Sequence, residues 1–204
     1  FEKLIIKFIK KNKIKYIINF AANNDNSIYS KNFNEIIQSN FNLAVKFIEI
    51  SKKLNLTLFL FSSKDMNKSY SIQNFYSISK LMLQSFLENC GSDIKVRILN
   101  LDSIYGPQDF NFKRIIPSII LKILAKKRNL NKINFNQKKN FTYVKDVNKL
   151  ISKLLNNNKK NIYKEMPSKR YYIDDLYTYL KDLDFNFNEK TYKYKSFVET
   201  LKWY

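Results

Sequence analysis

Apolar positions along the chain recur first with the spacing of a helix and then in short unbroken runs. Residues 2–11 carry apolar side chains at helical spacing, and residues 15–21 form an apolar run rich in β-forming residues. The same succession of helical spacing and apolar run occurs again further on. Residues 33–53 suit a long helix with one buried face, and residues 56–61 are a continuous apolar run. The pattern predicts a helix followed by a buried strand, twice in succession.

A third pair follows, because residues 76–89 suit a helix and residues 94–101 suit a strand. Strands that are apolar on both faces and alternate with helices are typical of a parallel sheet covered on two sides. We therefore expect an α/β fold with a doubly wound parallel sheet. After Gly106 and Pro107 the pattern changes to helices and short elements with many tyrosines, which predicts a small C-terminal lobe.

Charge raises the question of which partners the chain binds. Lys and Arg number 37 against 17 Asp and Glu, which gives a formal net charge of +20. The basic residues are nearly all lysines spread evenly along the chain, whereas a phosphate-binding surface clusters its charge and favours arginine. Direct nucleic-acid binding is therefore the less favoured alternative, and we expect no nucleic-acid partner.

Composition also bears on metals and membranes. The chain has no His and a single Cys, Cys90, so zinc sites of the usual kinds and an intrachain disulfide are not expected, and no metal is predicted. No apolar run approaches the ~20 residues that span a bilayer, and no signal peptide is recognisable. We expect a cytoplasmic protein without a membrane span.

The pair Tyr76 and Lys80 is the most informative candidate for chemistry. Positions i and i+4 share one face of a helix, so the phenol and the amine can reach one site, where the ammonium lowers a tyrosine pKa from about 10 towards neutrality. With 14 Tyr and many Lys, chance could give this spacing, and the alternative is a solvated helix face. Ser63 favours function, because it follows the apolar strand at the edge where open α/β sheets bind ligands.

Several segments, in the same order, resemble the extended short-chain dehydrogenase/reductases, the NAD-dependent epimerase/dehydratase family that acts on nucleotide sugars. The matching segments are residues 16–22 (YIINFAA), Asn40, residues 61–63 (FSS), Tyr76 with Lys80, residues 104–107 (IYGP), Ile116 with Pro117, residues 139–147 (KNFTYVKDV) and residues 197–204. The resemblance implies a partial Rossmann-like sheet. Residues 1–107 are then the C-terminal part of an NAD(P)-binding domain, and residues 108–204 a mixed region with the substrate-binding lobe.

The same resemblance implies the site and the reaction. NAD or NADP is the implied cofactor, a nucleotide sugar the implied substrate, and a Tyr–Lys–Ser proton shuttle with hydride transfer the implied chemistry. The implied catalytic residues are Ser63, which we prefer to Ser62, Tyr76 and Lys80. The implied cofactor-binding residues are Ala21, Ala22, Asn40, Tyr76 and Lys80, and the implied substrate-binding residues are Asp65, Ser103, Pro117 and Lys139. A homodimer through residues 33–53 and 76–89 is also implied.

Three departures from the family pattern bear on the activity. The Gly-rich phosphate loop is absent, since the chain has only two Gly, so it should bind a dinucleotide poorly as it stands. Asn100 and Lys139 stand where the family has Arg, which alters substrate binding. Lys64 and Asp65 follow Ser63 in place of an acidic pair, which favours an epimerase or 4-keto reductase over a 4,6-dehydratase. A catalytically inactive fragment or interaction module is the alternative of a different class.

Overall fold

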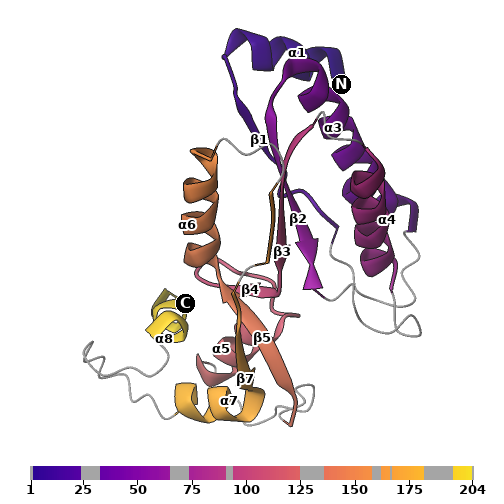
Figure 1. The fold of residues 1–204 in the computed structure, drawn as a ribbon. Coiled ribbons are helices and arrows are strands. Elements are labelled where there is room, and N and C mark those ends of the chain that lie inside the picture. Colours follow the sequence, from indigo (N-terminus) through magenta and orange to yellow (C-terminus); the bar gives the residue numbers. More distant parts are fainter. Residues whose placement is uncertain are drawn as a thin grey trace. The chain divides into compact units, whose positions relative to one another are not determined.

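The computed structural model describes residues 2–23, 33–64, 74–90, 94–124, 136–157, 162–165, 167–181 and 195–203. The chain forms two compact units (Figure 1). The first comprises residues 1–101 and 151–166, and the second comprises residues 102–150 and 167–204. The chain therefore passes from the first unit to the second, returns to the first for residues 151–166, and then enters the second again.

A parallel sheet forms the centre of the first unit. Its strands, in the order β1-β2-β3-β6, are β1 (Tyr16–Ile18), β2 (Thr57–Ser63), β3 (Lys95–Leu101) and β6 (Ile162–Glu165). Each neighbouring pair is parallel. Three successive residues of β2, Leu58, Phe59 and Leu60, are at most 1% exposed, as expected for a strand covered on both faces. The predicted α/β fold with a parallel sheet is confirmed.

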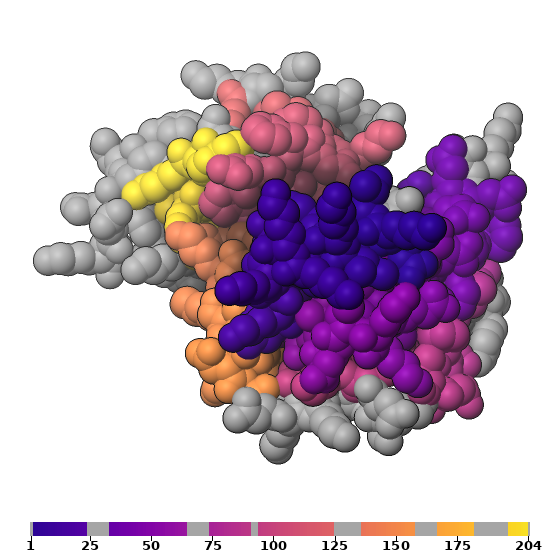
Figure 2. Space-filling view, turned by 90° about the horizontal axis from the view of Figure 1, so that it is seen from above, coloured from indigo at the N-terminus to yellow at the C-terminus, as the bar shows by residue number. Residues whose placement is uncertain are grey.

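Helices α3 (Leu43–Leu54) and α4 (Phe75–Asn89) lie on the same side of this sheet, and α1 (Glu2–Lys11) lies at one end of it. Side chains from α3, α4 and the sheet share one core, which contains Ala44, Ile48, Leu58, Leu60, Leu83, Ile94 and Val96. Figure 2 shows α1 in indigo across one end of the unit. There Ile9 is buried with Ile50 of α3, whereas Leu4 on the same helix is 73% exposed.

The predicted helix over residues 33–53 is interrupted by a wider turn. The structure has α2 (Phe33–Ile37), then one stretch of π-helix, η1 (Gln38–Asn42), and then α3. A π turn holds more residues than an α-helical turn and so changes which side chains face inward. Here it places Asn40 in the interior, with 2% of its surface exposed.

A side-chain cap defines the start of α4. The Asn74 side chain accepts a hydrogen bond from the Ser77 backbone N at 2.9 Å, which satisfies one of the unpaired donors of the first turn. Tyr76 therefore lies in the first turn of the helix. At the other end, α4 finishes at Asn89.

Two side chains from the sheet cap the end of α6 (Val144–Leu155), whose last turn belongs to the first unit. Arg97 Nη2 donates to the Asn157 carbonyl at 2.7 Å, and Tyr16 Oη donates to the Leu155 carbonyl at 2.8 Å. The last carbonyls of a helix lack partners within it and carry partial negative charge. The guanidinium, in a residue only 2% exposed, compensates that charge in the interior.

The second unit is built on a mixed three-stranded sheet. Strand β4 (Ser103–Tyr105) is parallel to β5 (Lys138–Tyr143), which is antiparallel to β7 (Lys169–Tyr172). The remaining helices of this unit are α5 (Ile115–Leu124), α7 (Ile173–Lys181) and α8 (Lys195–Trp203).

Aromatic side chains form much of the core of the second unit. The Tyr105 ring stacks on Phe197 with 4.1 Å between centroids, and its hydroxyl is 2.5 Å from Ser196 Oγ. Phe141 of β5 contacts the same two rings edge-on. The tyrosine of the Ile-Tyr-Gly-Pro segment therefore has a packing role in the structure.

Gly106, which follows Tyr105 in that segment, lies against the first residue of α6. A Cβ built at position 106 would overlap Val144 Cγ1 and lie 3.2 Å from Val144 Cβ. The side chain of Val144 therefore leaves no room for a side chain at position 106.

We expect Gly106→Ala to lower the free energy of unfolding by about 2 kcal/mol, because overpacking of this kind typically costs 1–3 kcal/mol. Urea titration followed by circular dichroism measures the loss. In a Val144→Ala background, which removes the overlapping methyl group, the loss should become smaller, and the part that stays reflects the backbone conformation at position 106 and the contact with the Val144 Cβ. An equal loss in both backgrounds would show that this contact is not the cause.

Candidate active site

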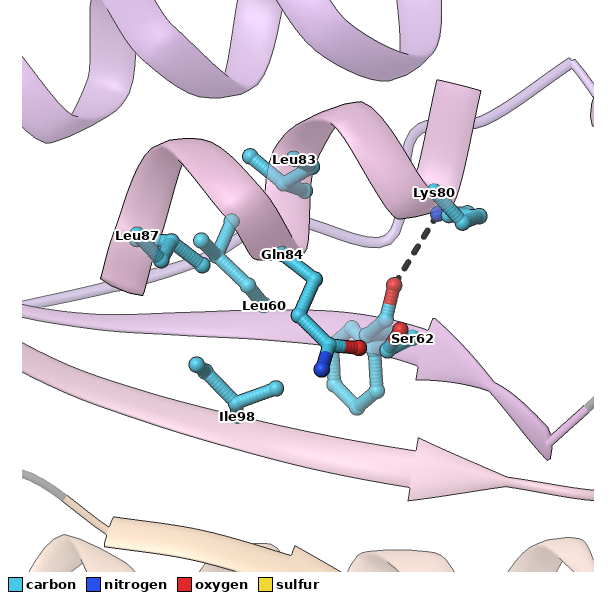
Figure 3. A pocket seen from close by; sticks show the side chains of 8 residues that line it. Leu60, Ser62, Lys80, Leu83, Gln84, Leu87 and Ile98 are labelled. Atoms are coloured by element: carbon cyan, nitrogen blue, oxygen red, sulfur yellow. Dashed lines mark hydrogen bonds between the residues drawn. The ribbon is translucent and has the colours of Figure 1, made fainter. Parts of the chain in front are cut away.

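Lys80 is the buried charged group at the carboxyl end of the parallel sheet. It lies on α4, is 6% exposed, and its Nζ donates a hydrogen bond of 2.9 Å to the Phe61 carbonyl (Figure 3). Phe61 is two residues from the end of β2. Burial lowers the pKa of the Lys80 amine from 10.5 to about 8. The amine is therefore charged at neutral pH and loses its proton in mild base.

Tyr76 lies one helical turn before Lys80, as the spacing predicts. The Lys80 Nζ is 5.6 Å from the centroid of the Tyr76 ring, within the range of a cation–π contact. The tyrosine is half-buried, whereas Lys80 is buried apart from 6% of its surface. The structure brings these two predicted site residues together.

The two strand-end serines lie differently with respect to Lys80. Ser62 lines a small cavity together with Lys80 and Gln84 (Figure 3). Side chains alternate along a strand, so Ser63 has the opposite orientation and shares its face with the Phe61 ring, which stacks on Phe20 at 4.5 Å. Ser62 therefore shares a face with the lysine, and the catalytic role of Ser63 stays a prediction. Its alternation with the apolar Leu60 was a signal available in the sequence.

The cavity beside Lys80 is small and mainly apolar. Its other lining residues are Leu60, Phe61, Leu83, Leu87 and Ile98. Its volume is about 10 Å³, which is room for one water molecule at most. The cavity is therefore too small for a substrate, and its apolar walls account for the desolvation of the amine.

The segment that follows β1 holds the next group of predicted residues. Ala21 and Ala22 are exposed, and the Ala21 backbone N donates to Asn19 Oδ1 at 3.1 Å. Asn23 is bound through its backbone N and O to the side chain of Asn40, at 2.7 and 2.9 Å. Because β1 and β2 are parallel neighbours, this segment lies at the same edge of the sheet as the end of β2.

The predicted substrate residues that the structure describes belong to the second unit. Ser103 on β4 pairs with Phe141, and Lys139 lies two residues from Phe141 on β5, so Ser103 and Lys139 share a face of this sheet. Pro117 is buried in α5. Asp65 lies outside the described residues.

The described ranges contain neither a metal-binding cluster nor a membrane-spanning helix. No group of three or more His, Cys, Asp or Glu side chains there could hold a metal ion. No helix in the described part of the chain is long and apolar enough to cross a bilayer.

A parallel sheet with a buried lysine at its carboxyl edge, one turn from a tyrosine, defines a Rossmann-like α/β protein with a Tyr–Lys site. The family follows from the sequence match. The chain belongs to the NAD dependent epimerase/dehydratase family, whose model matches residues 2–165. The resemblance inferred from the motifs is confirmed.

The chain is also similar to solved structures, although no curated protein sequence matches it. UDP-glucose 4-epimerase from Thermotoga maritima is 12% identical with a TM-score of 0.82, covering 99% of this chain and 81% of that one. dTDP-glucose 4,6-dehydratase from Bacillus anthracis is 16% identical (TM-score 0.75; 100% and 76%). UDP-N-acetylglucosamine 4-epimerase from Methanobrevibacter ruminantium is 18% identical (TM-score 0.75; 98% and 78%). At these identities the similarity establishes the fold.

Proposed function

We propose that the chain carries the catalytic residues of an NAD(P)-dependent nucleotide-sugar epimerase or 4-keto reductase. The observation that supports this most directly is the buried Lys80 amine, held at the carboxyl edge of the parallel sheet one turn from Tyr76. Family membership and the similarity to two nucleotide-sugar 4-epimerases add to it.

The described residues fit one half of a dinucleotide. A lysine ammonium has three N–H groups and Lys80 gives one to the Phe61 carbonyl, which leaves two for the hydroxyls of a ribose. Ala21 and Ala22, exposed at the same edge, offer backbone close to the cofactor. The pyrophosphate half has no Gly-rich loop within residues 1–204, so tight dinucleotide binding requires phosphate contacts that this stretch does not provide.

When bound, the nicotinamide supplies the hydride acceptor or donor for a sugar carbon. Tyr76 takes the proton from the sugar hydroxyl during oxidation and returns it during reduction. The positive charge of Lys80 favours the phenolate form of Tyr76 and so makes this proton transfer accessible near neutral pH. A strand-end hydroxyl orients the sugar oxygen. Ser63 is the proposed residue and Ser62 the competitor, and separate alanine variants distinguish them.

Ser103, Pro117, Lys139 and Asp65 are the proposed contacts to the nucleotide sugar. Lys139 would meet a phosphate as a point charge without the two-pronged geometry of an arginine. A 4,6-dehydratase needs an acid and a base to remove water, and Lys64 occupies one of the two positions. This favours an epimerase or reductase, although a dehydratase is among the similar structures.

We also propose a homodimer through residues 33–53 and 76–89. In the structure these helices are neighbours within one copy, with Phe41 against Phe86 and Phe33 against Phe75. An open groove along the first of these two segments is lined by Glu35, Gln38, Ser39, Leu43 and Lys46. Light scattering of the purified protein measures the oligomeric state directly.

Incubation of the complete gene product with UDP- and dTDP-sugars tests the proposed reaction. An epimerase converts the sugar without net accumulation of NADH, a reductase consumes NADPH, and a dehydratase releases water and forms a 4-keto-6-deoxy sugar. The absence of both turnover and dinucleotide binding would favour the inactive interaction module, which the missing Gly-rich loop supports.

A further inference from the structure

The side chain of Asn40 has no hydrogen-bonding capacity left over. A primary amide offers two N–H donors and two acceptor lone pairs. Its Oδ1 accepts from Asn23 N at 2.7 Å and from Ser39 Oγ at 2.9 Å, and its Nδ2 donates to Asn23 O at 2.9 Å and to Ser79 Oγ at 3.0 Å. All four positions are therefore used inside the protein.

These bonds connect the end of β1 to the helix that carries the Tyr–Lys pair. Ser79 is fully buried, and its hydroxyl donates to the Tyr76 carbonyl at 2.7 Å while accepting from Asn40. A continuous chain of hydrogen bonds thus runs from the Asn23 backbone through Asn40 and Ser79 to the Tyr76 backbone. Lys80 is the residue directly after Ser79.

The π turn makes this connection geometrically available. Asn40 is the middle residue of Gln38–Asn42, and the wider turn directs its amide inward between the β1 end and α4. Buried polar networks of this kind hold elements in a single arrangement when every member is satisfied. A displacement of about 1 Å in reacting groups can reduce a rate by about 100-fold, so such a connection matters for catalysis.

We infer that Asn40 is a positioning residue, which fixes α4 relative to the Ala21–Asn23 segment through Ser79 and does not itself contact the dinucleotide. The inference adds a positioning role to the proposed function. It rests on that function only for the assignment of Tyr76 and Lys80 as reacting groups. The expected result of breaking the connection is a displaced Lys80 in a more hydrated environment.

Ser79→Ala tests the inference without any assay of activity. The titration midpoint of the Lys80 amine, followed by nitrogen NMR of the lysine Nζ, should rise from about 8 by about one pH unit, because a loosened α4 lets water reach the amine. Ser85→Ala is the matched control, since Ser85 is exposed on the same helix. Ser79→Thr, which keeps the hydroxyl, should restore the low midpoint.

Asn40→Ala should give the same change in the Lys80 midpoint, and the double variant should change it no further, because both substitutions break one connection. If Ser79→Ala fails to fold, Ser79→Cys, which weakens the bonds at nearly constant size, replaces it. A Lys80 midpoint unaltered in folded variants would overturn the inference.

Steady-state kinetics separates positioning from direct contact. In Ser79→Ala, kcat should fall about tenfold while KM for the dinucleotide changes less than threefold. A higher KM in Asn40→Ala with an unaltered kcat and Lys80 midpoint would instead show cofactor contact and overturn the inference. If the unaltered protein has no turnover, the proposed function fails, and the NMR measurement still decides the role of Asn40.

Discussion

Replacing Tyr76 with Phe is expected to reduce nucleotide-sugar turnover by about 10³-fold, within the range that positioned acid–base catalysis contributes. The substitution removes only the hydroxyl that moves the proton. The ring that lies 5.6 Å from the Lys80 Nζ remains, so the lysine should keep its place and KM should change less than threefold. Measurement of kcat and KM, with whichever nucleotide sugar the incubation experiment identifies as the substrate, checks both values.

Tyr172→Phe is the matched control for this experiment. Tyr172 is 45% exposed on β7 in the second unit, and loss of its hydroxyl should leave kcat within twofold of the unaltered protein. If the turnover of Tyr76→Phe stays within threefold of the unaltered protein, Tyr76 does not act in the mechanism, and the Tyr–Lys spacing is a chance match.

Replacing Lys80 with Met is expected to abolish turnover and yet stabilise the fold at neutral pH by about 2 kcal/mol. The pKa of the amine is about 8 in the folded protein against an ordinary 10.5, so burying its charge costs about 3 kcal/mol. Loss of the hydrogen bond to Phe61 offsets about 1 kcal/mol of the gain. The site would thus retain a destabilising group that the chemistry requires.

The difference in free energy of unfolding between Lys80→Met and the unaltered protein should change with pH in one direction. Between pH 8 and 10.5 the folded protein has released the Lys80 proton while the unfolded chain still binds it, so stability rises with pH in this window. The gain in free energy of unfolding that Lys80→Met gives should therefore be largest below pH 8 and should disappear above pH 10.5. Urea unfolding at several pH values measures it, with Lys46→Met, an exposed lysine on α3, as the control. A difference that does not vary with pH contradicts a buried, desolvated amine.

The elements that local patterns predict best are those with long, uniform periodicity. The helix at residues 2–11 and the helix from Phe75 to Asn89 have the predicted extent within a residue, because a stripe of apolar residues is a local signal. The strand predicted at residues 15–21 is shorter, Tyr16–Ile18, and just beyond it the Asn19 side chain accepts a hydrogen bond from the Ala21 backbone.

The features that the sequence did not predict depend on residues distant along the chain. The π turn around Asn40 is stabilised by bonds to residues 17 and 39 positions away, so no local spacing reveals it. The return of residues 151–166 to the first unit is likewise a matter of tertiary packing. For the site, the helical spacing predicts that Tyr76 and Lys80 meet, and the alternation of side chains along β2 places Ser62 on the same face as Leu60.

The wide turn at Gln38–Asn42 makes the length of this helix as important as its composition. Removing one residue there would let ordinary α-helical winding replace the wide turn, so Asn40 would lose its inward position while later residues kept nearly the same face. Adding one residue would instead rotate the later positions by about 100°, and Ala44 and Ile48, now in the core, would turn away from the sheet. The gene should therefore accept many missense changes in this stretch more readily than the gain or loss of a single codon.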